Sequence, residues 1–106
     1  MTVAQFHHVG VPTDAQQPDE TYLEGGKVYI TDPEASPYRF EYLRFEADSP
    51  LPEAMKTNPH VAYMVDDLAA AMEGEEVLLE PFEPMENLRV AFIVKDGIVV
   101  ELMQEI

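Results

Sequence analysis

The sequence predicts an α+β fold made of two βαβββ-type modules, and three observations support this prediction. A His-Val pair stands at the head of an apolar run twice, in "FHHVGV" and in "PHVAYMV". The second half of the chain shows one helix and four strands in a readable order. A glutamate interrupts an apolar strand near the end of each half, in "RFEYL" and in "VVELM".

The second module, residues 59–106, begins with its clearest elements. Residues 60–65 alternate with a period of two, which is typical of a strand with two distinct faces. Asp66 and Asp67 follow as candidate N-cap residues, and the small and apolar residues after them predict a short helix that ends at Gly74.

Three more strands complete the second module. Residues 77–79 predict a strand that ends at Pro81 and Pro84, because proline cannot donate to a sheet ladder. Residues 88–94 and 98–103 flank a Lys-Asp-Gly turn, and Asp-Gly is a strong signal for a β-hairpin.

The first module, residues 1–47, follows the same order with a reduced helix. Residues 6–11 predict its first strand. Residues 13–24 stand where the helix belongs, but Pro18 interrupts them and they contain no apolar stripe to bury. We therefore expect a loop or a single turn in place of this helix.

The remaining strands of the first module are predicted at residues 27–31 and 38–45. A proline-rich linker, residues 48–58, then leads into the second module. With one short linker and a length of 106 residues, the chain is expected to form a single domain, residues 1–106.

The spacing of the matched residues tests the duplication. His8 and Glu41 are 33 positions apart, whereas His60 and Glu101 are 41 apart. The first module is therefore shorter by about two helical turns, which is the length of the helix that it lacks.

The two histidines are candidate metal ligands because of the face on which they lie. Alternation along a strand puts His8 on one side with Gly10, and His60 on one side with Ala62, so both histidines face a space lined by small side chains. His7 is the rival of His8, but alternation turns it to the opposite face.

Glu41 and Glu101 are the candidate carboxylate partners. A carboxylate inside an apolar strand is costly unless another group pairs with it. Taken singly, such a histidine is more often structural and such a glutamate more often faces solvent. The doubled His/Glu pattern favours one divalent ion held by His8, Glu41, His60 and Glu101.

Composition limits the other possibilities. The formal net charge of -15 disfavours nucleic acid and anionic membrane surfaces as partners. The absence of cysteine excludes disulfides, thiolate metal sites and cysteine nucleophiles. The first residues show neither a basic segment nor a long apolar one, so a cytoplasmic location is expected.

The segments "FHHVGVPT", "PHVAYMVDDLAAAMEG" and "RVAFIVKDGIVVELMQ" resemble the vicinal oxygen chelate superfamily, which includes glyoxalase I, bleomycin-resistance proteins and extradiol dioxygenases. The resemblance is good over residues 59–104 and thinner over residues 1–45. It implies a cupped mixed sheet that holds a divalent ion, with ligands from the first and last strands of each module. The missing first helix and the short chain depart from glyoxalase I.

The resemblance implies a metal-dependent lyase or isomerase that acts on a small α-hydroxy or α-keto carbonyl compound. Glu101 is then the first choice for the residue that moves a proton, and Glu41 is its near-equivalent. The ion stays open among Zn, Ni, Co, Mn and Fe. The alternative is a non-catalytic protein of the bleomycin-resistance type that sequesters a small molecule. A homodimer is expected, because a short chain leaves sheet edges to be covered.

Overall fold

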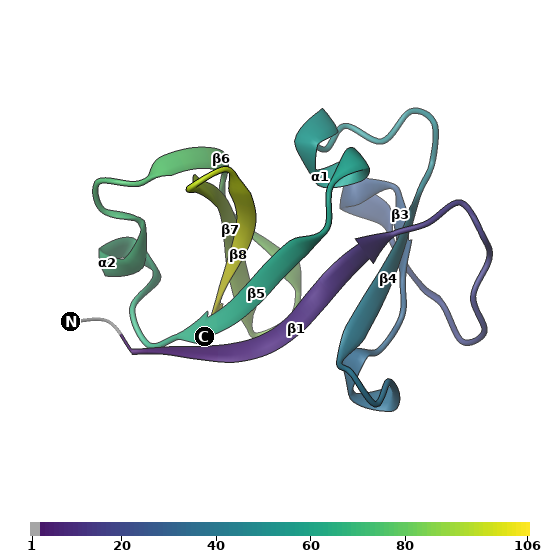
Figure 1. Ribbon diagram of the computed structural model, residues 1–106, viewed down its shortest axis with the longest axis horizontal. Helices are drawn as coiled ribbons and strands as arrows, with labels where there is room; N and C mark the ends of the chain where they lie inside the picture. The colour runs from purple at the N-terminus through teal and green to yellow at the C-terminus, as the bar shows by residue number, and fades with distance from the viewer. Residues whose placement is uncertain (1–2) are drawn as a thin grey trace.

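The computed structural model describes residues 3–106, which form one mixed sheet of eight strands curled into a half-barrel (Figure 1). The strands are β1 (Ala4–Pro12), β2 (Thr21–Leu23), β3 (Val28–Ile30), β4 (Phe40–Phe45), β5 (His60–Val65), β6 (Glu76–Met85), β7 (Leu88–Lys95) and β8 (Ile98–Glu105). The helical segments are η1 (Glu24–Gly26), η2 (Pro33–Ala35), α1 (Glu53–Thr57) and α2 (Leu68–Met72). None of the helices within residues 3–106 is long and apolar enough to cross a lipid bilayer.

The strand order confirms the α+β fold with two βαβββ-like modules. The order across the sheet is β2-β3-β4-β1-β5-β8-β7-β6, so each module reads the same way outward from the centre. In each module the first strand pairs in parallel with the last, β1 with β4 and β5 with β8. The modules join through the antiparallel pair of β1 and β5, which run side by side through the middle of Figure 1.

The strand register confirms the residue matching between the modules. Glu41 is paired with Gly10, two positions after His8. Glu101 is paired with Ala62, two positions after His60. The same histidine-to-glutamate offset in both modules means that the two halves of the chain place these side chains in equivalent positions.

The helix positions follow the sequence prediction in both modules. Within the expected helix position of the first module, residues 13–24, residues 13–20 form neither helix nor strand, but Thr21–Leu23 form β2, a strand that the sequence did not predict. In the second module α2 begins after Asp67, whose side chain accepts a hydrogen bond from the Ala70 backbone N–H at 3.1 Å. This capped helix packs against β8 and β7 on the outer face of the sheet.

The predicted end of the strand at residues 77–79 was wrong. Strand β6 continues through Pro81 and Pro84 to Met85. It is an edge strand with no neighbouring strand on its outer side. A proline nitrogen, which cannot donate a hydrogen bond, is therefore tolerated where it faces that open side. Its register against β7 also shifts at three places, and such irregularities accommodate proline.

The linker contributes to the core, which its proline content did not predict. Residues 53–57 form α1, and Met55 on this helix is 3% exposed. It belongs to the concave-side cluster, together with Ala62, Val90, Phe92, Val99 and Met103. The linker therefore helps to close one side of the curled sheet as well as joining the modules.

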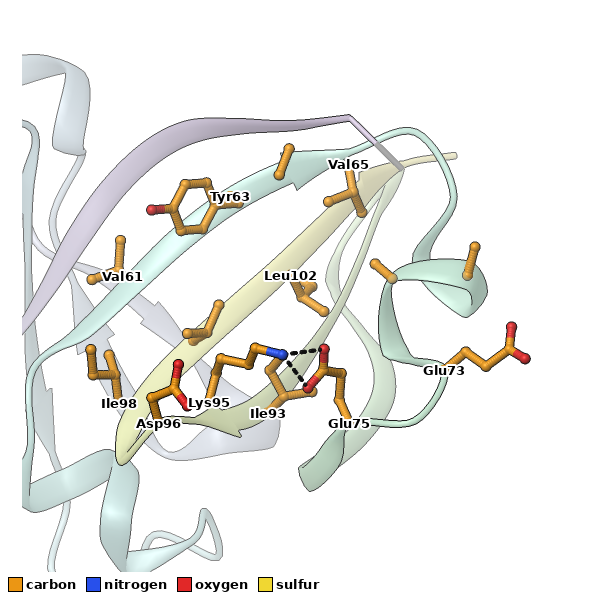
Figure 2. Close-up of a pocket in the computed structure, with 14 residues that line it drawn as sticks. Val61, Tyr63, Val65, Glu73, Glu75, Ile93, Lys95, Asp96, Ile98 and Leu102 are labelled. Carbon is orange, nitrogen blue, oxygen red and sulfur yellow. Dashed lines mark hydrogen bonds and ion pairs between the residues drawn. The ribbon is translucent and has the colours of Figure 1, made fainter. Parts of the chain in front are cut away.

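A second apolar cluster lies on the outer face of the sheet, where Leu68 of α2 packs against Val65 and Leu102. Beside it is a hollow between α2 and the strands, lined by residues such as Val61 and Tyr63 (Figure 2). Lys95 at this hollow is paired with Glu75 at 3.1 Å. The hollow is on the face opposite to the histidines, because Val61 and Tyr63 alternate with His60 and Ala62 along β5.

Candidate metal centre

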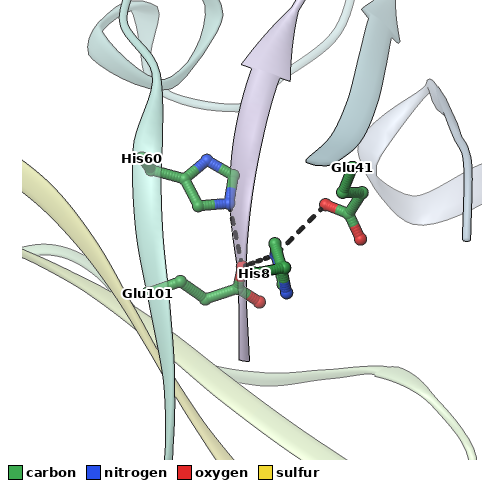
Figure 3. Close-up of side chains that lie close together, drawn as sticks. All are labelled: His8, Glu41, His60 and Glu101. Carbon is green, nitrogen blue, oxygen red and sulfur yellow. Dashed lines mark hydrogen bonds and ion pairs between the residues drawn. The ribbon is translucent and has the colours of Figure 1, made fainter. Parts of the chain in front are cut away.

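The structure brings all four predicted ligands together at the centre of the sheet. Glu41, His8, His60 and Glu101 come from the adjacent strands β4, β1, β5 and β8. Each offers one ligand atom, and these four atoms all lie within 4.8 Å of one another. Figure 3 shows the four side chains pointing toward a common point from their separate strands.

Glu101 is the carboxylate that both histidines contact. Its Oε1 atom lies 3.0 Å from Nε2 of His60, as a hydrogen bond, and 3.3 Å from Nε2 of His8. Glu41 lies farther away, with its Oε1 atom 3.5 Å from Nε2 of His8 (Figure 3). The two carboxylates therefore share His8, and only Glu101 also contacts His60.

Burial makes these contacts significant. His8 and His60 are each 1% exposed, and Glu101 is also buried. Within residues 3–106, the buried side-chain atoms without a hydrogen-bond partner are Nε2 of His8 and Nδ1 of His60. Nε2 of His8 lies 3.3 and 3.5 Å from the two carboxylates without a well-formed hydrogen bond to either, so two acids converge on a buried point that requires a positive charge, from a proton on His8 or from a cation.

Gly10 is required for the position of the His60 ring. These two residues are opposite each other in the β1–β5 pair, and His8 is opposite Ala62. A Cβ atom added to Gly10 would lie 2.0 Å from Cε1 of His60, far inside van der Waals contact. Glycine thus leaves the space that the imidazole occupies, and the expected small-residue lining of the site is confirmed.

His7 contacts the site through His8, which strict alternation along the strand did not predict. The register of β1 against β5 shifts between Phe6 and His8, so His7 is the extra residue of a bulge. A 2.7 Å hydrogen bond joins Nδ1 of His7 to Nδ1 of His8, and the Arg39 side chain donates to the His7 carbonyl. The His-His doublet was the only sequence signal for this contact.

The electrostatics of the cluster tie the charge of His8 to the two carboxylates. Burial lowers the pKa of His8, but Glu101 and Glu41 together outweigh it and raise this pKa to about 9. Burial also raises the pKa of Glu101, and the contacts with His60 and His8 reverse this effect and lower the pKa to about 2. Without a cation, the cluster therefore keeps a proton on His8 to balance its negative charge.

The donor set fits a divalent ion. Two imidazoles and two carboxylates suit Zn and the other first-row divalent metals, and the buried ligands leave little competition from solvent. Ligands at about 2.0–2.2 Å from one ion lie at most about 4.4 Å apart. The four ligand atoms lie within 4.8 Å of one another, so the side chains must draw closer together on binding an ion.

Comparison with known proteins adds no family to this description. No protein-family model matches the chain, and a search of curated proteins finds no relative. The structure does show a curled mixed sheet with a buried His/Glu cluster, which is the coarse architecture that the resemblance implied. The chemistry of the site has to be inferred from its own geometry.

Proposed function

We propose that this protein is a divalent-metal-dependent lyase or isomerase of the glyoxalase type, acting on a small α-hydroxy or α-keto carbonyl compound. The observation that carries the proposal is the convergence of two buried imidazoles and two carboxylates, whose four ligand atoms lie within 4.8 Å of one another. A cavity also has Glu41, His60 and Glu101 in its lining, so a small molecule in it can reach the cluster.

In this proposal His8, Glu41, His60 and Glu101 hold the ion. When bound, a divalent ion polarises neighbouring substrate oxygens and stabilises negative charge that develops on them. The side chains around it come from four strands of one sheet, so their positions are set by backbone pairing and change little on binding.

One glutamate must also move a proton. It takes the proton from the hydroxyl-bearing carbon beside the carbonyl, so that the C–H electron pair becomes a C=C bond and the carbonyl π pair moves onto the carbonyl oxygen. The proton then returns to the former carbonyl carbon, and the hydroxyl proton passes to the other oxygen, which leaves a new carbonyl on the first carbon. From the sequence, Glu101 is the first choice for this role, but the contacts of the two carboxylates favour Glu41. Two imidazoles hold Glu101 at 3.0 and 3.3 Å, whereas Glu41 has one contact at 3.5 Å and is freer to turn toward a substrate.

The alternative function is sequestration of a small molecule without turnover, as in proteins of the bleomycin-resistance type. The formal net charge of -15 favours it, because such a charge attracts cationic ligands. This function does not require the four side chains to hold an ion, so protein that binds no ion favours sequestration, and proton exchange separates the two functions when an ion is bound.

The test is metal stoichiometry, followed by proton exchange. We expect protein equilibrated with Zn²⁺ or Co²⁺ to retain one ion per chain, and His60→Ala to lose it. Glu105→Gln is the matched control, because Glu105 is an exposed acid at the end of the strand that carries Glu101. Wild-type protein that retains no divalent ion at any pH at which it is folded would contradict the proposal.

Catalysis is then tested separately from binding. The metal-loaded protein is expected to exchange deuterium from the solvent into the carbon beside the carbonyl of hydroxyacetone, followed by NMR. Glu41→Gln should lose a larger fraction of the exchange rate than of the bound metal. A stoichiometric ion without exchange on any small α-hydroxy ketone would favour sequestration.

A further inference from the structure

A cavity of about 440 Å³ lies on the concave side of the sheet and has the candidate metal centre in its wall. Glu41, His60 and Glu101 line it on one side. The volume falls within the range of small-molecule sites, about 300–1,000 Å³. What else lines this cavity therefore bears on which substrate the proposed enzyme can take.

The rest of the wall is mainly apolar and comes from both modules and the linker. Aliphatic side chains of β3, β4 and the linker lie on one side, and side chains of β6 and β7 lie on the other. The main apolar contributors are Val28, Leu43, Leu51, Met55, Phe82 and Phe92. A ligand that reaches the cluster must therefore place its remaining atoms against hydrocarbon.

The charges of the wall are all of one sign. The charged residues that line the cavity, within the described residues 3–106, are Glu41, Glu83 and Glu101, and no lysine or arginine is among them. Glu41 and Glu101 are the proposed ligands of the ion, and Glu83 is exposed and paired with Arg89 at 3.0 Å. A phosphate, sulfate or carboxylate on the substrate's tail would lie against hydrocarbon with no cationic side chain in the cavity wall, at a cost that grows with burial. Anionic tails are thus disfavoured, whatever group binds at the cluster.

We infer that the substrate is an uncharged compound with oxygen atoms on two neighbouring positions of its skeleton and an alkyl or aryl substituent beside them. This substituent occupies the apolar cavity. The inference rests on the proposed function, because the two oxygens require the ion. It separates the protein from enzymes whose substrates carry an anionic peptide, nucleotide or phosphate group. The protein's own negative charge of -15 acts in the same direction.

The test uses three hydroxamates, each of which presents two neighbouring oxygens to a metal and differs only in its tail. They are acetohydroxamate with a methyl tail, benzohydroxamate with a phenyl tail, and the monohydroxamate of succinate with a carboxylate tail. Binding is followed through the visible spectrum of the Co²⁺-loaded protein, which requires no turnover.

We expect benzohydroxamate to bind about tenfold more tightly than acetohydroxamate, because the phenyl ring leaves water for the apolar wall. The succinate derivative should bind more weakly than acetohydroxamate. Phe82→Ala should reduce the preference for the phenyl tail severalfold, because Phe82 lines the cavity and is half-buried on an edge strand. Ile98→Ala, in the hollow on the opposite face, should leave the preference unchanged.

Two failures are distinguishable. Protein that binds no Co²⁺ overturns the proposed function and this inference with it. Protein that binds Co²⁺ and acetohydroxamate, but shows no phenyl preference or prefers the carboxylate tail, overturns only the inference. A phenyl preference that persists in Phe82→Ala and disappears in Ile98→Ala would place the tail on the wrong face and would also overturn it.

Discussion

The two modules share a strand order but contribute unequally to the apolar core and equally to the histidine and glutamate cluster. The second module has three strands of eight to ten residues after its helix, whereas β2 and β3 of the first module have three residues each. Both apolar clusters are built from residues of the second module, together with the linker's Met55. The second module thus provides most of the core, while the first keeps its half of the histidine and glutamate cluster.

The comparison extends to single positions within the cluster. Gly10 and Ala62 are equivalent, as are Glu41 and Glu101, yet the members of each pair differ in their contacts. His60 lies where a side chain on Gly10 would be, and Glu101 contacts two imidazoles where Glu41 contacts one. A duplicated site can therefore be symmetric in backbone and asymmetric in chemistry, and substitutions at matched positions measure that asymmetry.

The largest difference is expected at the pair of small residues. Gly10→Ala should weaken metal binding by more than about a hundredfold, because the new Cβ would be 2.0 Å from the His60 ring and would displace it. Ala62→Gly removes only a methyl group and should change affinity by less than about tenfold. Isothermal titration with Zn²⁺ measures both. Equal losses in the two variants would contradict the asymmetry.

The glutamates should show the next largest difference. Glu101→Gln is expected to reduce metal affinity by about a hundredfold, and Glu41→Gln by about tenfold, because Glu101 also holds both histidines. Competition with a chromogenic chelator gives the two constants, and Glu105→Gln again serves as the control. A greater loss of affinity in Glu41→Gln would reverse the roles that we assign to the two carboxylates.

His7→Ala should have a smaller effect, about tenfold on metal affinity, because His7 contacts the ion's ligand His8 and not the proposed ion. His7→Asn, which retains a polar side chain at this position, should restore part of the loss. A structural role alone would lower the melting temperature without changing the metal affinity of the protein that remains folded.

The smallest effect concerns the metal-free protein and pH. Glu101 ionises with a pKa lowered from 4.5 to about 2, so its contribution to stability is present above pH 4.5 and is lost as pH falls toward 2. His8 has a pKa raised from 6.5 to about 9, so its contribution is present below pH 6.5 and is lost as pH rises through 9. Stability should be highest between these limits and fall by about 1 kcal/mol or more on each side.

Urea titrations across the pH range measure this profile. His8→Gln should flatten the alkaline side. Glu101→Gln should flatten the acid side and also reduce the alkaline decline, because Glu101 helps to raise the pKa of His8. A wild-type profile without an alkaline decline would show that His8 does not keep its proton in the metal-free protein.

Much of the fold was predictable because the alternation of apolar residues along a strand and the residue preferences of tight turns depend only on nearby positions in the sequence. The alternation of residues 60–65 and the Asp-Gly turn specified β5 and the β7–β8 hairpin, in which Asp96 and Gly97 have positive φ of 52° and 80°. The convergence of the four ligands was predictable because a repeat fixes equivalent positions. Residues whose structure depends on their neighbours were less predictable.

Three features show where sequence reasoning stops. The continuation of β6 through Pro81 depends on its place at the sheet edge, which only the assembled sheet reveals. The bulge at His7 depends on how β1 and β5 align, and no residue type signals it. The buried Met55 turned a proline-rich linker into part of the core, because the concave side of the sheet needed an apolar cover.

The antiparallel pairing of β1 with β5 has an evolutionary consequence. Each module carries one imidazole and one carboxylate, and the four meet only across this seam. A half-length ancestor with a single module would have had an incomplete centre by itself, but two identical copies joined along their first strands would have completed one. The present chain corresponds to two such copies joined by the linker. Once they were joined, the first module could lose its helix.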